Sequence, residues 1–274
     1  MPLPDGVTCV LAPNPSLLTG PGTNTYVIAG TIGPCAVVDP GSDAPGHLDA
    51  IVRAAGSRGI GHILITHGHP DHAGGAAPLR ALTGAPVLAW SREGVPDADR
   101  TLGDDERVVI GDRTLRALYT PGHRFDHLCF LLDDSGALFA GDLVAGVGTV
   151  VIAPPEGDMR DYLASLNRLL TLHDLQMILP AHGPSITDGP ALLRSYLAHR
   201  LEREQQVLGG LRNGPTTVAT LVAQIYADVD PALHPAAARS ILAHLLKLEH
   251  EGRVARAPEA QDGEAWALVP SAQP

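Results

Sequence analysis

The chain has 274 residues, of which 45% are hydrophobic and 18% charged, and this composition excludes a disordered protein. Its length predicts one large domain or a domain with a smaller one attached. The formal net charge is −11. Residues 1–189 contain 11 Lys and Arg against 21 Asp and Glu, and residues 190–274 contain 8 against 9. Neither part therefore offers a basic surface for duplex DNA.

The chain starts with MPLPDGVTCVLAPNPS, which has no basic segment followed by a long apolar one. It therefore does not resemble a secretory signal. No uninterrupted apolar run reaches the roughly 18 residues that a membrane helix needs. We expect a cytoplasmic protein without a membrane partner.

The first half of the chain alternates short apolar runs with Gly and Pro. Residues 7–10, 24–29 and 35–39 are predicted strands, residues 47–60 have helical spacing, and 62–66 is a buried strand. Further strands are predicted at 86–90, 106–110, 113–119, 127–132, 137–140 and 176–180, and helices at 74–84 and 158–172. This order predicts two sheets packed face to face with helices outside, an α/β domain over residues 1–189.

Three cysteines, Cys9, Cys35 and Cys129, lie in apolar runs and form no C-x-x-C pair. We expect all three to be small buried hydrophobic residues without a disulfide.

The C-terminal residues 190–274 have a helical pattern. Helices are predicted at 190–211, 216–226 and 235–252, and two short strands at 253–257 and 265–269. Three helices and a hairpin resemble a winged helix, although other helical caps have a similar pattern. Because its charges nearly cancel, we expect this domain to cap the substrate entrance or form an interface rather than bind duplex DNA.

The segment ITHGHPDHAGG, residues 65–75, places four metal-binding side chains in six positions, namely His67, His69, Asp71 and His72. Imidazoles and carboxylates packed this densely after a strand need partners. Alternation along a tight loop would point His67 and His69 toward one metal, and Asp71 and His72 toward a second. Imidazole and carboxylate ligands suit zinc, with iron and manganese as competitors.

Two metal sites require ligands from other segments, and three further residues follow predicted strands. His123 lies in YTPGHRFDH, Asp142 in LFAGDLVAG and His182 in ILPAHGPS. Each lies beside or near a glycine, which allows close backbone approach to a crowded centre. His127 is a weaker candidate, and we expect it to be hydrogen bonded to a neighbour.

This ordered set of residues resembles the metallo-β-lactamase-fold hydrolases over about residues 7–190. The resemblance implies an αββα sandwich in which His67, His69 and His123 bind one zinc, Asp71, His72 and His182 bind the other, and Asp142 bridges them. Asp39, in VVDPG, matches an aspartate of this family that contacts the metal ligands rather than the metal and so supports the site. The bridging hydroxide expected between two zinc ions is the nucleophile, and Asp71 is the candidate that orients it.

The position of Asp142 narrows the class of reaction. The commonest zinc β-lactamases have a cysteine there, and no cysteine follows Cys129, so we do not expect a true β-lactamase. An aspartate resembles instead the glyoxalase II, ribonuclease Z and lactonase branches. The segments at 14–28, 145–166 and 199–207 resemble the lactamase-β-like protein 2 group, whose mitochondrial animal member is an endoribonuclease on single-stranded RNA.

The leading hypothesis is a binuclear zinc phosphodiesterase that acts on single-stranded RNA, because the resemblance favours it. The first rival is a hydrolase of a small thioester, ester or lactone, which the negative charge of the protein favours. A DNA-binding regulator would need a basic recognition helix, which residues 235–252 do not provide. An iron enzyme of the persulfide dioxygenase type would need fewer ligands at the second metal.

Overall fold

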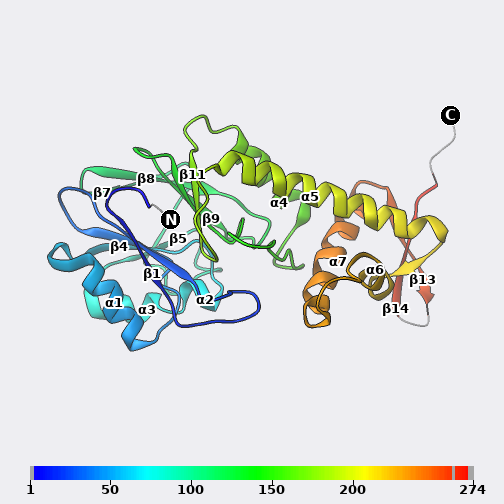
Figure 1. Ribbon diagram of the computed structural model, residues 1–274, viewed down its shortest axis with the longest axis horizontal. Coiled ribbons are helices and arrows are strands. Elements are labelled where there is room, and N and C mark those ends of the chain that lie inside the picture. Colours follow the sequence, from blue (N-terminus) through cyan, green and yellow to red (C-terminus); the bar gives the residue numbers. More distant parts are fainter. Residues whose placement is uncertain (1–2, 261–262, 271–274) are drawn as a thin grey trace.

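Figure 1 shows the computed structural model, which describes residues 3–260 and 263–270. A sandwich of two sheets occupies one end of the molecule, and a smaller helical domain the other. The first sheet has six strands in the order β1 (Val7–Leu11), β2 (Asn24–Ile28), β3 (Cys35–Val38), β4 (Ile60–Leu64), β5 (Val87–Ala89) and β6 (Arg100–Thr101). The second has five, in the order β11 (Met177–Pro180), β10 (Ala137–Gly141), β9 (Leu128–Leu132), β8 (Arg113–Tyr119) and β7 (Arg107–Ile110).

The two sheets face each other across an apolar core. Tyr26 of β2 meets Phe139 of β10 at a ring-centroid distance of 5.2 Å. All five residues of β9 are buried, because one face of this strand meets the first sheet and the other meets helices. Burial of these apolar faces is the main force that holds the sheets together.

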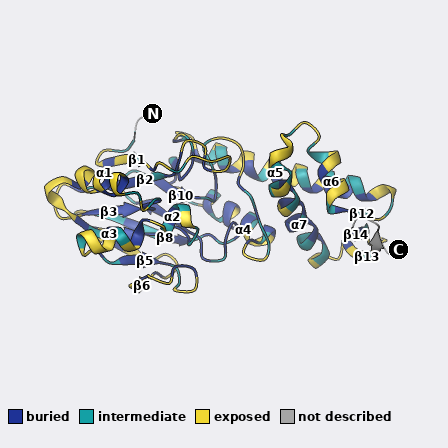
Figure 2. Ribbon diagram, turned by 90° about the horizontal axis from the view of Figure 1, so that it is seen from below, coloured by how far each residue is buried: buried dark blue, intermediate teal, exposed yellow. Residues whose placement is uncertain are grey.

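Helices cover the outer faces of both sheets. The first sheet carries α1 (Pro45–Ala55), which continues into a 3₁₀ turn at Gly56–Arg58, and α3 (Ala76–Thr83). The second sheet carries α4 (Met159–Leu170), whose N-terminus is capped by the Asp158 carboxylate. Figure 2 shows α1 and α3 exposed on their outer sides. The predicted αββα sandwich is confirmed.

The C-terminal domain is built on α5 (Gly189–Gly210), the longest helix of the chain's described part. It continues through a 3₁₀ turn (Leu211–Asn213), β12 (Thr216–Thr217), α6 (Val218–Ile225), a 3₁₀ turn (Pro231–Leu233), α7 (His234–His250), β13 (Val254–Ala260) and β14 (Gly263–Leu268). The strands form one sheet in the order β12-β14-β13. Three helices with this small sheet confirm the predicted winged-helix-like fold.

Helix α5 belongs to both domains. Leu193 and Tyr196, in its first half, pack in the core behind the second sheet, whereas Val207 and Leu208 pack in the C-terminal core. Figure 1 shows the helix crossing from one part to the other. The division at residues 189/190 thus falls at the start of a shared helix, and it stays a prediction.

One prediction about the cysteines is wrong. Cys35 and Cys129 are buried, but Cys9 is exposed, and all three are free thiols. Cys9 lies on the edge strand β1, where three of five side chains are exposed. An edge strand has a neighbour on one side only, so an apolar sequence does not ensure burial.

Two strands and one helix differ from the predicted elements. β6 and β12 were not expected, because two residues carry no periodicity. The predicted metal-binding loop contains a helical turn, α2 (Pro70–Ala73), which begins at a proline. No helix in residues 3–260 or 263–270 combines the length and the apolarity required to cross a membrane.

Candidate metal centre

The densest part of the candidate site follows β4. His67 lies three residues after the strand ends, and its side chain is buried. His69 is the residue before α2, and Asp71 and His72 lie within that helical turn. The turn aims Asp71 and His72 at the ends of the second sheet. A strand followed by a tight helical turn therefore presents all four side chains on one side of the molecule.

The other three candidates come from turns of the second sheet. His123 follows β8, Asp142 follows β10, and His182 follows β11. Two glycines allow the turns before His123 and Asp142 to pack closely. Gly122 has φ +130°, and a Cβ there would lie 2.2 Å from the Tyr162 backbone of α4. Gly141 has φ +49°, and a Cβ there would lie 2.7 Å from Thr66 Oγ1. Only glycine fits both the backbone angles and the space.

Three histidines form a first group of converging nitrogens. His69 Nδ1 lies 2.8 Å from His67 Nε2 and 3.2 Å from His123 Nε2. The ligand atoms of the three all lie within 4.8 Å of one another. His123 donates its other nitrogen, Nδ1, to the Val151 carbonyl at 2.9 Å, which leaves Nε2 as an acceptor directed at the group.

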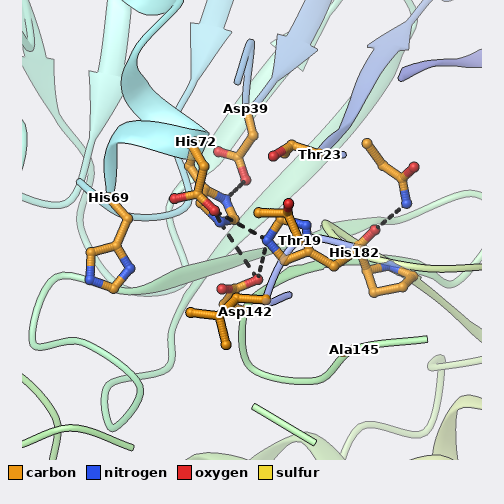
Figure 3. A network of polar contacts seen from close by, with 12 residues as sticks. Thr19, Thr23, Asp39, His69, His72, Asp142, Ala145 and His182 are labelled. Atoms are coloured by element: carbon orange, nitrogen blue, oxygen red, sulfur yellow. Dashed lines mark hydrogen bonds and ion pairs between the residues drawn. The ribbon is translucent and has the colours of Figure 1, made fainter. Parts of the chain in front are cut away.

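Asp71, His72 and His182 form a second group with the same spacing limit of 4.8 Å. His182 Nε2 lies 3.4 Å from Asp71 Oδ2. The carboxylate of Asp142 lies between the groups, 3.3 Å from His182 Nε2, 3.6 Å from His72 Nε2 and 3.7 Å from His123 Nε2. Figure 3 shows Asp142, His72 and His182 pointing toward one another.

Asp39 holds His72 from the side away from the group. The Asp39 carboxylate accepts hydrogen bonds from His72 Nδ1 at 2.8 Å, from the Thr66 amide at 2.8 Å and from the Thr66 hydroxyl at 2.6 Å. Figure 3 shows the contact of Asp39 with His72. Asp39 thus lies behind His72, and its supporting role at a metal site stays a prediction.

Burial and the neighbouring charges set the protonation of the cluster. Burial, with repulsion from the other histidines, puts the pKa of His67 well below its usual value and lowers the pKa of His123 to about 4. Burial alone would lower the pKa of His72, but the carboxylates of Asp142 and Asp39 outweigh it and raise that pKa well above normal. Burial would raise the pKa of Asp142, but His72 and the other histidines lower it strongly.

These donors fit divalent cations. His72 Nε2 and Asp142 Oδ1 are buried and have no hydrogen-bond partner, which is costly unless a further group binds them. His67 and His123 are kept neutral and Asp142 ionised, as metal ligands must be, whereas His72 and His182, whose pKa values are raised, would release a proton on binding a metal. Imidazole with carboxylate suits zinc and iron. The structure brings all seven predicted ligands together, and their division between two metals stays a proposal.

Sequence reasoning missed several residues around the cluster. Glu156 Oε2 lies 3.6 Å from His69 Nε2 and 3.4 Å from Arg124 Nε. Arg124 also pairs with Asp126, whose carboxylate accepts the Gly68 amide at 3.0 Å. Arg124 directly follows a ligand histidine, which was an available signal, whereas nothing local marks Glu156.

His127 has the supporting role that was preferred for it. Its Nε2 accepts the Asp142 amide at 3.1 Å, so Nδ1 carries the proton and donates it to Thr120 Oγ1 at 3.0 Å. This fixes the backbone at Asp142.

A two-sheet sandwich with histidines and aspartates converging at the strand ends defines a class of metal-dependent hydrolases. The family model of the metallo-beta-lactamase superfamily matches residues 18–182, and that of the beta-lactamase associated winged helix domain matches residues 217–266. The chain belongs to the metallo-beta-lactamase superfamily.

Similar proteins extend this match over nearly the whole chain. An atrochrysone carboxyl ACP thioesterase from Aspergillus chevalieri is 34% identical, with 98% of this chain and 90% of that protein covered. The beta-lactamase-like protein 2 homolog of Drosophila melanogaster is 31% identical, with coverages of 98% and 96%. A crystal structure of a beta-lactamase domain protein from Burkholderia ambifaria has the same fold, with a TM-score of 0.84, 22% identity and coverages of 98% and 93%.

Proposed function

We propose that this hydrolase binds two zinc ions and cleaves a thioester or ester that carries an apolar acyl group. The observation behind the metals is the convergence of seven imidazole and carboxylate side chains, with two buried atoms left without hydrogen-bond partners. The support for the substrate comes from the charge and side chains around the site, and from the thioesterase named among the relatives.

The two groups of donors would each hold one ion, with Asp142 shared. When bound, two such ions activate water for attack and polarise the oxygen of the scissile bond. Asp71 is the most exposed of the ligand carboxylates, with a side chain 31% exposed against 15% for Asp142. Although burial opposes it, the hydrogen bond from His182 lowers the pKa of Asp71, so this side chain is ionised and able to accept a proton from the attacking water.

The loops that contact His182 carry large apolar side chains. His182 Nδ1 donates to Gly22 O at 3.4 Å, and Gly146 N donates to His182 O at 2.8 Å, so the loops at 12–23 and 143–148 both touch it. Leu17 and Leu18 on the first loop are 72% and 63% exposed, and Val147 on the second is 75% exposed. Exposed apolar side chains on loops that contact a histidine of the metal centre suit an acyl group better than a polyanion.

Single-stranded RNA is the second candidate, supported by the resemblance to the lactamase-β-like protein 2 group and by the fly relative of nearly equal length. The net charge of −11 opposes it. Arg124, the cation beside His123, is already paired with Asp126 and Glu156.

A substrate panel separates the candidates. Protein loaded with zinc, and the same protein treated with a chelator, would be assayed on an aromatic acyl thioester, a lactone, a labelled single-stranded RNA and a nitrocefin control. We expect chelator-sensitive release of thiol from the thioester as the fastest reaction. Faster cleavage of the RNA would replace this proposal by the ribonuclease one, and hydrolysis without bound metal would reject both.

A further inference from the structure

The segment from Leu143 to Val151 connects the candidate ligand Asp142 to the carbonyl that holds His123. It begins directly after Asp142 and ends at Val151, whose carbonyl accepts Nδ1–H of His123 at 2.9 Å. The position of this segment therefore influences both the shared carboxylate and one histidine of the first group.

Side chains of α4 and α5 hold the segment along its length. Tyr162 of α4 donates its hydroxyl hydrogen to Leu143 O at 2.8 Å. Tyr196 of α5 accepts the Ala145 amide at 2.9 Å. One turn further along α5, the Arg200 guanidinium donates to Val150 O at 2.6 Å. Helix α5, which continues into the C-terminal domain, thus binds the segment near both ends.

Arg200 is an unusual residue for this position. It is 2% exposed, its Nε has no hydrogen-bond partner, and within the described ranges 3–260 and 263–270 it forms no ion pair. Glu204, the acid one turn along the helix, is bound to Lys247 and Arg253 instead. The guanidinium lies 5.2 Å from the centre of the Tyr162 ring, which compensates part of the charge.

A buried cation without a carboxylate partner destabilises a fold relative to an apolar side chain of similar size. Stability alone therefore does not account for Arg200. Its strongest contact is the carbonyl next to the one that orients His123, so the contact fixes the peptide unit between Val150 and Val151.

We propose that Arg200 is a positioning residue that sets the affinity of the His67, His69 and His123 group for its metal by holding the Val151 carbonyl against His123. This inference rests on the proposed binding of two metal ions. Through α5, the same contact ties the C-terminal domain to the metal centre.

The test compares zinc binding by the full-length protein with that of two variants. Apo protein, Arg200→Met and Arg203→Met would each be titrated with Zn²⁺ against a chromophoric chelator, and their thermal unfolding recorded without metal. Arg203 lies one turn away on the same helix, where it contacts Gln206 and the Tyr226 ring rather than the segment, so its replacement is the matched control.

We expect one of the two zinc affinities to fall about tenfold in Arg200→Met, because the Val151 carbonyl that orients His123 is held less firmly and losses of such support begin at about tenfold. The other affinity, and both affinities of the control, should not change. The unfolding temperature of apo Arg200→Met should equal or exceed that of the parent, because an unpaired buried charge is removed. Arg200→Lys, which keeps a donor, should recover part of the affinity.

A second readout does not depend on the stability of the variant. In zinc-loaded protein with ¹⁵N-labelled histidine, the Nδ1–H proton of His123 should exchange faster in Arg200→Met, and that of His72, held by Asp39, should not. Unchanged zinc affinities and exchange in Arg200→Met would overturn the inference. A lower unfolding temperature with equal loss at both sites would also overturn it, because the role would then be structural. If the parent protein itself binds no zinc, the proposed function fails instead.

Discussion

Replacing Asp39 by Ala tests the link between the fold and the metal centre. The Asp39 carboxylate is 2% exposed and accepts hydrogen bonds from His72 Nδ1, the Thr66 amide and the Thr66 hydroxyl. The hydroxyl retains another partner, because it also lies 3.1 Å from His67 Nδ1. The substitution therefore strands the Thr66 amide and leaves His72 Nδ1–H with one long contact, 3.4 Å to the Thr66 hydroxyl.

Each stranded buried donor costs about 1–3 kcal/mol. We expect the free energy of unfolding of apo Asp39→Ala to fall by roughly 1–6 kcal/mol, between the cost of one stranded donor and that of two. A water molecule that enters the new space would bring the loss toward the lower value. Because His72 loses the acceptor that orients its ring, zinc affinity should also fall by about 10–100-fold.

Urea unfolding of the apo protein and competitive zinc titration measure the two effects separately. Asp49→Ala, which removes an exposed acid from α1, is the control for the change in net charge. Unfolding within about 0.5 kcal/mol of the parent, together with unchanged zinc affinity, would refute the assigned role of Asp39.

Three further predictions concern metal content, the shared carboxylate and pH. Elemental analysis of reloaded protein should give two metal ions per chain, and one or none would contradict the division into two groups. Asp142→Ala should reduce this content and lower hydrolysis by at least about 100-fold, while circular dichroism shows an intact sandwich. Burial, together with Arg200 and Lys247, lowers the pKa of His244 to about 3, below its unfolded value of about 6.5. Between these two values the unfolded state binds a proton that the folded state does not, so the folded state loses stability as the pH falls from 6.5 toward 3. Between pH 7 and pH 5, the urea midpoint of His244→Leu should fall less than that of the parent protein. An equal fall in both proteins would contradict the lowered pKa of His244.

The sequence predicts the metal centre better than its surroundings. The seven candidate ligands are recognisable because each follows an apolar run, and strand ends meet at one edge of a sandwich. Thr66, by contrast, has the pattern of an ordinary strand residue, although it bonds both Asp39 and His67. Glu156 reaches His69 from a loop whose path depends on the whole second sheet.

The same limit applies to burial and to long-range contacts. The exposure of Cys9 depends on which strand lies at the sheet edge, and that is a property of the topology rather than of the local run. Arg200 has the helical spacing of the buried residues Leu193 and Tyr196, but its charge is typical of a surface residue. It is buried because α5 crosses from one core to another, and no periodicity within the helix marks this crossing.

Helix α5 also limits how the two domains could be recombined or moved. Its 22 residues form one uninterrupted rod of about 33 Å, so the domains have no flexible linker about which to swing. A chimera with the C-terminal domain of a relative would have to be joined within the helix and in phase with its turns, since one inserted residue rotates everything beyond it by about 100°. For the same reason, length variation among natural relatives is expected in the turns on either side of α5 and not within it.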